Sequence, residues 1–214
     1  MLGNLDKAEK LYFQLIEIMK DEMQDDENPD DDEMVLSIAA HIAQIYIHKS
    51  MFAESEALIK KYLDRQILLR GENCPIIVNA QRNLAATLVK LKRFDESESL
   101  LNRMIQNQTA LGQDTMELKF ILTESYEARG DFVRSGIIIS DCLEIATKRH
   151  GEKSSAVIGI SFKLAMNFYH QRLFSQGDEV LKRTIQLSIQ FLGPNHTQTL
   201  QYKKFYSDRL KSNL

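Results

Sequence analysis

The chain has 214 residues, of which 43% are hydrophobic and 27% are charged, a composition typical of folded soluble proteins and not of disordered ones. Only 3 Pro and 9 Gly occur, too few to form the many turns of a many-stranded β protein, so the sequence favours long helices. The net charge of −3, with scattered Lys and Arg, excludes the basic footprint of a nucleic-acid-binding protein, and no apolar run is long enough to span a membrane.

The first predicted element is a helix over residues 5–20. Its apolar side chains recur at helical spacing and form a stripe made up of Leu5, Ala8, Leu11, Tyr12, Leu15 and Ile16. Part of this stripe can pack on the following helix, which is expected to start near Met34. The rest of the stripe is expected to be exposed, unless the chain is part of a longer array. We therefore predict that the protein can pair with itself or with a partner through this helix.

Residues 21–33 form an acidic run of nine Asp or Glu residues that contains no Lys or Arg. The dipeptide Asn28-Pro29 disfavours a helix at the centre of this run, so we predict a solvated loop. Such a loop could contact a basic partner. Its removal is expected to leave the fold intact.

Four units follow, and each can be aligned on one phenylalanine. The aligned residues are Phe52, Phe94, Phe132 and Phe174, which are separated by 42, 38 and 42 residues. Ile or Leu stands ten residues before each phenylalanine, Ala or Thr nine before, Ser or Gly three after, and Ile or Leu seven after. Apolar residues spaced in this way lie on one face of a helix, and the small residues let two helices approach closely. The glycines that close the units are Gly71, Gly112, Gly151 and Gly193.

Each unit is therefore predicted to be a pair of amphipathic helices: a first helix before the phenylalanine and a second helix that begins at it. The units span residues 34–71, 75–112, 114–151 and 154–193, and a closing helix over residues 194–213 starts at Pro194. One pair cannot bury its apolar faces alone, so neighbouring pairs must stack. The chain is accordingly predicted to be a single array over residues 1–214.

The recurring sequence of these units resembles the tetratricopeptide repeat. The features that carry the resemblance are the Leu or Ile followed by Ala, as in Asn83-Leu84-Ala85, the phenylalanine at the turn, and the glutamate four residues later at Glu56 and Glu98. Units near 42 residues, with links such as Leu192-Gly193-Pro194-Asn195-His196-Thr197, are similar to the repeats of kinesin light chains. The opening Gly3-Asn4-Leu5-Asp6-Lys7-Ala8-Glu9 also resembles the mitochondrial tetratricopeptide family of respiratory complex III assembly.

The resemblance implies an all-α fold, a right-handed α-solenoid of stacked antiparallel helix pairs with about ten helices. It also implies a protein–protein interaction scaffold that binds a peptide or helix of a partner in a groove lined by the first helices. A cargo adaptor of the kinesin light chain kind and a mitochondrial assembly factor for respiratory complex III are the alternatives. Thr123 and Gly136 stand where the repeat usually has Ala and Glu, so the third unit is divergent.

Polar residues at matching positions of the first helices are the candidates for contacting the partner. They are Gln44, Arg82, Asn83, Glu124, Glu127, Lys163, Tyr169 and His170. The clamp of Lys and Asn with which related repeats hold the C-terminus of a chaperone has no counterpart here, because Ala40 and Ala86 stand where long or polar side chains would be needed. We therefore predict no preference for a terminal carboxylate.

The sequence carries no catalytic or metal-binding pattern, so neither an enzyme nor a bound cofactor or metal is expected. Phosphate-binding Gly-rich loops, Gly-x-Ser-x-Gly and His-Glu-x-x-His are all missing, and His41 and His48 lack further ligands at metal spacing. A helical active site would instead require a cluster of buried titratable residues. Cys74 and Cys142 are expected to be reduced thiols, which favours an intracellular, cytoplasmic protein; a basic presequence would point to mitochondria.

Overall fold

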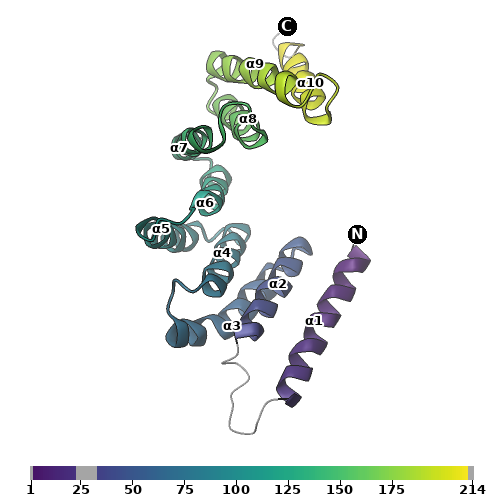
Figure 1. Cartoon of the computed structure of the whole chain (residues 1–214), viewed down its shortest axis with the longest axis vertical. Coiled ribbons are helices and arrows are strands. Elements are labelled where there is room, and N and C mark those ends of the chain that lie inside the picture. The colour runs from purple at the N-terminus through teal and green to yellow at the C-terminus, as the bar shows by residue number, and fades with distance from the viewer. Residues whose placement is uncertain (1, 23–32, 212–214) are drawn as a thin grey trace. The chain divides into compact units, whose positions relative to one another are not determined.

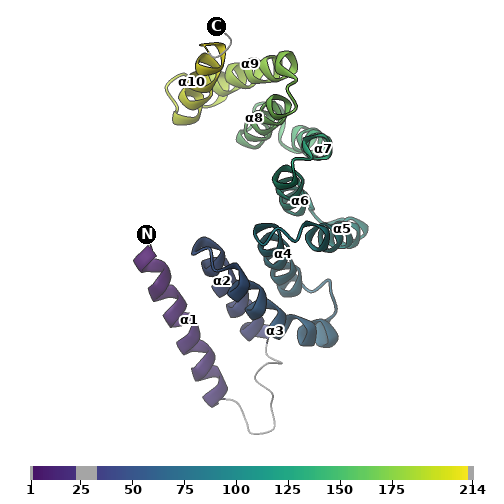
Figure 2. The ribbon, with the colours of Figure 1, turned by 180° about the vertical axis from the view of Figure 1, so that it is seen from behind.

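The computed structural model describes residues 2–22 and 33–211, and every regular element in these ranges is an α-helix (Figures 1 and 2). The predicted all-α fold is confirmed. The helices of the described ranges are α1 (Leu2–Glu22), α2 (Glu33–His48), α3 (Phe52–Arg70), α4 (Pro75–Lys90), α5 (Phe94–Ala110), α6 (Met116–Arg129), α7 (Phe132–His150), α8 (Ser155–His170), α9 (Phe174–Phe191) and α10 (Thr197–Lys211). Every second helix of a pair begins at the aligned phenylalanine.

The boundaries differ from the sequence-based expectation at the start of the first helix, at the acidic loop and before the last helix. α1 begins at Leu2, three residues before the predicted start. Most of the predicted acidic loop, residues 23–32, lies outside the described ranges, but Asp21 and Glu22 belong to α1 and Glu33 begins α2. Pro194 lies in the linker before α10, which begins only at Thr197.

Contacts between helices group the chain into two compact units, residues 1–125 and 126–214, with the boundary inside α6. In the first unit α1 lies beside α2, α2 packs on α3 and α4, and α4 packs on α5 (Figure 1). In the second unit α7 packs on α8, α8 on α9, and α9 on α10 (Figure 2). Within each unit the helices pack in chain order, as stacked pairs require. A single array over residues 1–214 stays a prediction.

The first helix of every pair ends in the same tight turn. Two residues before the aligned phenylalanine the backbone is left-handed, with φ of 61° at Ser50, Lys92 and Arg172 and 83° at Gly130. The amide of the following residue then donates to the carbonyl five residues earlier, at 2.8–2.9 Å in all four pairs. This hydrogen bond satisfies a carbonyl at the helix end. It also offsets the roughly 1–2 kcal/mol that a non-glycine residue costs in the left-handed region.

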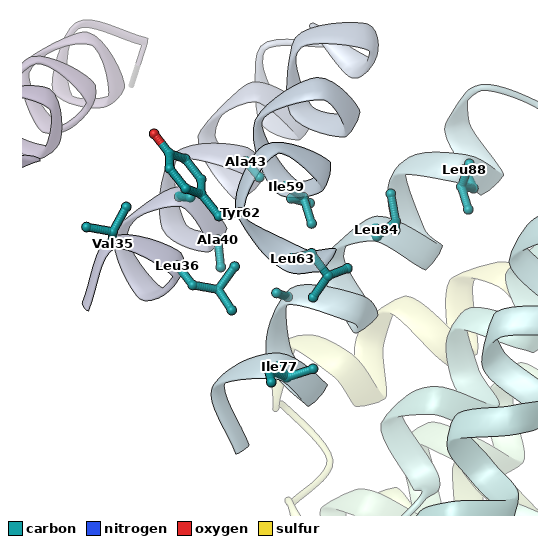
Figure 3. Close-up of a cluster of buried hydrophobic side chains, with 12 residues drawn as sticks. Val35, Leu36, Ala40, Ala43, Ile59, Tyr62, Leu63, Ile77, Leu84 and Leu88 are labelled. Atoms are coloured by element: carbon teal, nitrogen blue, oxygen red, sulfur yellow. The ribbon is translucent and has the colours of Figure 1, made fainter. Parts of the chain in front are cut away.

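The core of the first unit explains why alanine recurs in the first helices. Ala40 and Ala43 of α2 lie against Ile59 and Leu63 of α3, and Leu84 of α4 belongs to the same cluster (Figure 3). Ala43 and Ile59 are fully buried. Because alanine presents only a methyl group, α2 and α3 can approach closely enough for the large side chains of α3 to fill the space between them.

α1 packs through one side of its apolar stripe. Tyr12 packs against Ile38 and Ile42 of α2, and both isoleucines are buried. Leu11 is 64% exposed and Leu15 is 40% exposed. The side of α1 that carries these two leucines is therefore uncovered within the described residues.

The serine three residues after the aligned phenylalanine forms hydrogen bonds as well as leaving room for the neighbouring helix. Ser55 Oγ donates to the carbonyl of Ala43 at 3.2 Å, and Ser97 Oγ donates to the carbonyl of Ala85 at 2.9 Å. Each bond ties a second helix to the first helix of its own pair. Ser55 Oγ also lies 2.9 Å from Thr87 Oγ1, which ties the first pair to the next.

The second unit repeats the bond between pairs with other side chains. Asn167 Nδ2 donates to Ser135 Oγ at 3.0 Å, and Asn167 occupies the position of Thr87 in its own pair. Ser135 Oγ in turn donates to Glu127 Oε1 at 3.0 Å. In the last pair the serine is replaced by Gly177, whose Cα faces the ring of Tyr169.

Candidate partner-binding surface

Two of the candidate residues in the first unit form a bridge between neighbouring first helices. Gln44 on α2 is exposed, and its Nε2 donates to Asn83 Oδ1 on α4 at 3.3 Å. Asn83 Nδ2 donates to the carbonyl of Ala40 at 3.0 Å, and Asn83 itself is only 5% exposed. Asn83 therefore holds α2 against α4 and leaves little surface for a partner, whereas Gln44 remains accessible.

Charged candidates in the first unit form ion pairs between α4 and α6, which are successive first helices. The Arg82 guanidinium on α4 forms an ion pair with Glu117 on α6, and its side chain is 25% exposed. Lys90 Nζ lies 3.8 Å from Glu124 Oε2, and both side chains are about half exposed. Exposed ion pairs of this kind contribute about 0–1 kcal/mol to stability because water screens them.

The charged candidates in the second unit form an equivalent pair. Lys163 Nζ on α8 lies 3.7 Å from Glu127 Oε2 on α6, with side chains 31% and 30% exposed. Glu127 also accepts the hydrogen bond from Ser135. The Glu127 carboxylate therefore takes part both in the contact between α6 and α7 and in the ion pair on the surface of the first helices.

The last two candidates make contacts inside the second unit. Tyr169 Oη donates to Asp178 Oδ1 at 2.7 Å, and the Arg209 guanidinium lies 5.5 Å from the centre of the tyrosine ring. Burial, together with the hydrogen bond to Asp178, raises the pKa of the Tyr169 phenol, so it stays neutral. His170 is exposed and stacks on Phe132, with ring centres 4.6 Å apart and planes 7° apart.

The structure thus joins Gln44 with Asn83 and Lys163 with Glu127, and it pairs Arg82 and Glu124 with residues of successive first helices that were not candidates. It does not bring Tyr169 and His170 to the other candidates, because they contact second helices and α10. Two further residues of this surface, Lys90 and Glu117, were not among the candidates. Opposite charges on successive first helices were the available signal for them. In the described ranges no helix is both long and apolar enough to cross a membrane, and no group of three or more His, Cys, Asp or Glu residues could hold a metal ion.

Comparisons with known proteins bear on the fold and the repeat. Residues 35–110 match the family model of the tetratricopeptide repeat, and a comparison with curated proteins gave no significant match. Solved structures with the same fold include a protein of Podosopora anserina that is named for kinesin light chain and has nearly identical TPR-like repeats. It aligns over 88% of this chain and 89% of its own, with a TM-score of 0.72 and 16% identity.

A variant of that protein aligns over 88% of both chains, with a TM-score of 0.73 and 16% identity. BtubC (BKLC) from P. vanneervenii aligns over 97% of this chain and 90% of its own, with a TM-score of 0.68 and 16% identity. The resemblance to the tetratricopeptide repeat is supported over residues 35–110 by the family model, and the solved structures share the expected fold. Residues 35–110 are tetratricopeptide repeat sequence, and the chain as a whole has the helical fold of kinesin-light-chain-type repeat proteins.

Proposed function

We propose that the protein is a non-catalytic scaffold that binds a peptide or helical segment of a partner protein along its first helices. The observation that carries the proposal is the row of polar contacts that joins successive first helices within each unit. In the first unit it comprises Gln44 with Asn83 and Arg82 with Glu117. The tetratricopeptide match over residues 35–110 supports an interaction role of this kind.

A partner can replace these contacts with contacts of its own, because the protein loses little stability when they break. Arg82, Glu124 and Lys163 make ion pairs that are at least partly exposed to water, and such a pair contributes about 0–1 kcal/mol. A bound segment with charges of both signs can take over these pairs. Charge complementarity would then set the choice of partner and the rate of association more than the affinity. We expect no selection for a terminal carboxylate, since Ala40 is buried and offers no donor.

Capture experiments with charge-reversed proteins test this assignment. The variant Arg82→Glu/Lys163→Glu reverses one basic residue of the first helices in each unit and is expected to lose the partners that the unaltered protein captures from a cell extract. The matched control is Arg103→Glu/Arg183→Glu, which makes the same charge change on second helices, where the two arginines pair with Glu72 and Glu152. The control is expected to keep the partners. Equal capture by the unaltered protein and both variants would place binding elsewhere.

A cargo adaptor of the kinesin light chain kind is the second candidate. It is favoured by the solved structures of the same fold, one of which is named for kinesin light chain. If the protein is such an adaptor, kinesin itself should appear among the captured proteins, and the Arg103→Glu/Arg183→Glu control should still capture it. The assembly-factor alternative has only its sequence resemblance in support.

A further inference from the structure

The second unit contains a cavity of about 280 Å³ between α7, α8 and α9. In these three helices, which follow one another in Figure 2, α8 packs on both α7 and α9. The apolar side chains that line the cavity come from all three: Leu143, Val157, Leu164, Val180 and Leu187. Val157 and Leu164 are only 3% and 7% exposed. The cavity is therefore bounded by the faces through which these helices pack on one another.

The corresponding helices of the first unit carry larger side chains at the same positions. Because α7, α8 and α9 each begin eighty residues after α3, α4 and α5, each residue of the cavity has a counterpart eighty positions earlier. Where the cavity has Thr147, Val157, Ser161, Val180 and Thr184, the first unit has Ile67, Ile77, Gln81, Leu100 and Met104. Ile67, Ile77 and Leu100 pack in one cluster with Leu63 and Leu84. The cavity thus lies where five side chains of a repeated packing are replaced by smaller ones.

A pair of opposite charges borders the cavity. Glu152 and Arg183 line it, and both side chains are more than half exposed, so they lie where the cavity meets solvent. Arg183 Nη2 donates to Glu152 Oε1 at 2.9 Å. A charged occupant would have to break this ion pair to gain one of its own, and its charge would lose water on entering. The border therefore favours a neutral occupant.

One hydroxyl in the cavity is available to an occupant. Thr147 Oγ1 and Thr184 Oγ1 donate to the carbonyls of Leu143 and Val180 at 2.7 Å and 2.8 Å. Ser161 is only 8% exposed, and within the described ranges its hydroxyl forms no hydrogen bond. Because a hydroxyl covered by apolar groups is costly unless it is hydrogen-bonded, Ser161 favours an occupant with a hydrogen-bonding group.

We propose that this cavity binds a small, neutral and mainly apolar molecule that carries one hydrogen-bonding group. An apolar cavity of about 150 Å³ in another protein binds benzene, so a cavity of about 280 Å³ has room for two fused rings. A partner's side chain fits less well, because the main chain that carries it would stay at the border, where Glu152 and Arg183 already bind each other. The proposal does not rest on the proposed function.

Titration of the protein into indole tests the proposal. The chain contains no tryptophan, so indole emission can be followed without a protein tryptophan signal. On binding, the emission should shift to shorter wavelength and its anisotropy should rise. Thr184→Met, which introduces the side chain of its counterpart Met104, should fill the cavity and weaken binding about tenfold or more. The matched control is Gln186→Met, which places the same side chain at an exposed position of α9 and should leave binding unchanged.

Two further comparisons test the chemistry of the occupant. Indole-3-acetate should bind more weakly than indole, since its carboxylate meets an arginine that is already paired. Ser161→Ala should weaken the binding of indole and leave that of naphthalene unchanged, because naphthalene has no hydrogen-bonding group. Equal losses for indole and naphthalene would contradict the role of the Ser161 hydroxyl, and tighter binding of indole-3-acetate would contradict a neutral occupant.

Three results would overturn the proposal. If neither indole nor 2-naphthol binds the folded protein, the cavity holds water only. If Thr184→Met binds indole as the unaltered protein does, the probe lies elsewhere. If N-acetyltryptophanamide, which carries the indole ring between two peptide groups, binds as tightly as indole, the occupant is a side chain of a partner protein. Circular dichroism checks that each variant keeps its helices, and Val180→Leu, which introduces the side chain of Leu100, replaces Thr184→Met if that variant loses helical signal.

Discussion

Replacing Gly159 or Gly177 with alanine makes the same chemical change in two helices of the second unit, but the structure predicts opposite effects. Gly159 lies in α8 and is exposed, and a Cβ at this position would meet no atom within 4 Å. Gly177 lies in the first turn of α9, and its Cβ would lie 2.7 Å from Cε1 of Tyr169. Real Cβ atoms do not approach other atoms so closely, so either the ring or the helix must move.

The expected magnitudes follow from these surroundings. Alanine is favoured over glycine inside a helix by about 0.5–1 kcal/mol, and Gly159→Ala should stabilise the protein by that amount. Gly177→Ala has the same gain opposed by an overpacking cost of roughly 1–3 kcal/mol. Tyr169 cannot easily yield, because it donates a 2.7 Å hydrogen bond to Asp178 and lies under the Arg209 guanidinium. The net effect of Gly177→Ala is a loss of up to about 2 kcal/mol.

Urea unfolding followed by circular dichroism measures both effects as shifts of the midpoint. A variant without the ring separates the clash from any other cause. In the Tyr169→Leu protein, the further substitution Gly177→Ala should raise the midpoint of unfolding. The two substitutions are in contact, so their effects are expected not to add. If Gly177→Ala raises the midpoint as much as Gly159→Ala does, the close approach of α9 to the Tyr169 ring is not a feature of the folded protein.

The remaining predictions concern a partly exposed ion pair and two buried serines. Burial alone would raise the pKa of Glu56, but hydrogen bonds from Lys60 and Arg93 outweigh it and lower the pKa below the ordinary value of 4.5. The pair therefore stabilises the protein above about pH 4.5, and this contribution is lost as the pH falls through the pKa of the folded state; the stability difference from Arg93→Gln should shrink on acidification. Among the described residues Ser125 Oγ is buried without a hydrogen-bond partner, so Ser125→Ala should be neutral or slightly stabilising in urea unfolding. Ser97→Ala, which removes a donor to a buried carbonyl, should cost about 1 kcal/mol, and equal effects of the two serine variants would contradict the assigned contacts.

The repeat was readable from the sequence because its strongest signals are local. Large apolar residues at helical spacing and a phenylalanine at each turn fix where the helices begin, and the second helices start at the expected residues. The residues of the third pair that depart from the usual repeat could be explained only from the structure. Gly136 replaces the usual glutamate where a Cβ would lie 2.6 Å from Asn167 Oδ1, so glycine leaves room for the amide that binds Ser135. Thr123 takes the place of alanine and satisfies its own hydroxyl by donating to the carbonyl of Lys119 at 2.8 Å.

The candidate surface was harder to predict, because a polar residue on a first helix can face either a partner or the next pair. Gln44 and Asn83 both looked like surface residues in the sequence. Only Gln44 is exposed, whereas Asn83 is buried and hydrogen-bonded to α2. The helical period predicts which side of its helix a residue lies on, but it does not separate residues that are adjacent on that side. It does not say how far the following helix is rotated, and that rotation separates these two amides.

Two positions of the repeat supply polar contacts between some neighbouring pairs. The first is the small residue three after the phenylalanine of one pair, and the second lies seven before the phenylalanine of the next. Where both pairs have the aligned phenylalanine, the combinations in chain order are Ser55 with Thr87, Ser97 with Ser125, and Ser135 with Asn167. Ser55 Oγ lies 2.9 Å from Thr87 Oγ1, and Ser135 Oγ accepts a hydrogen bond from Asn167, whereas Ser97 donates to the carbonyl of Ala85 and Ser125 Oγ has no hydrogen-bond partner among the described residues. Because a buried polar group without a partner costs about 1–3 kcal/mol, replacing one member of either hydrogen-bonded combination should weaken the contact between pairs, whereas Ser125 can lose its hydroxyl without that cost.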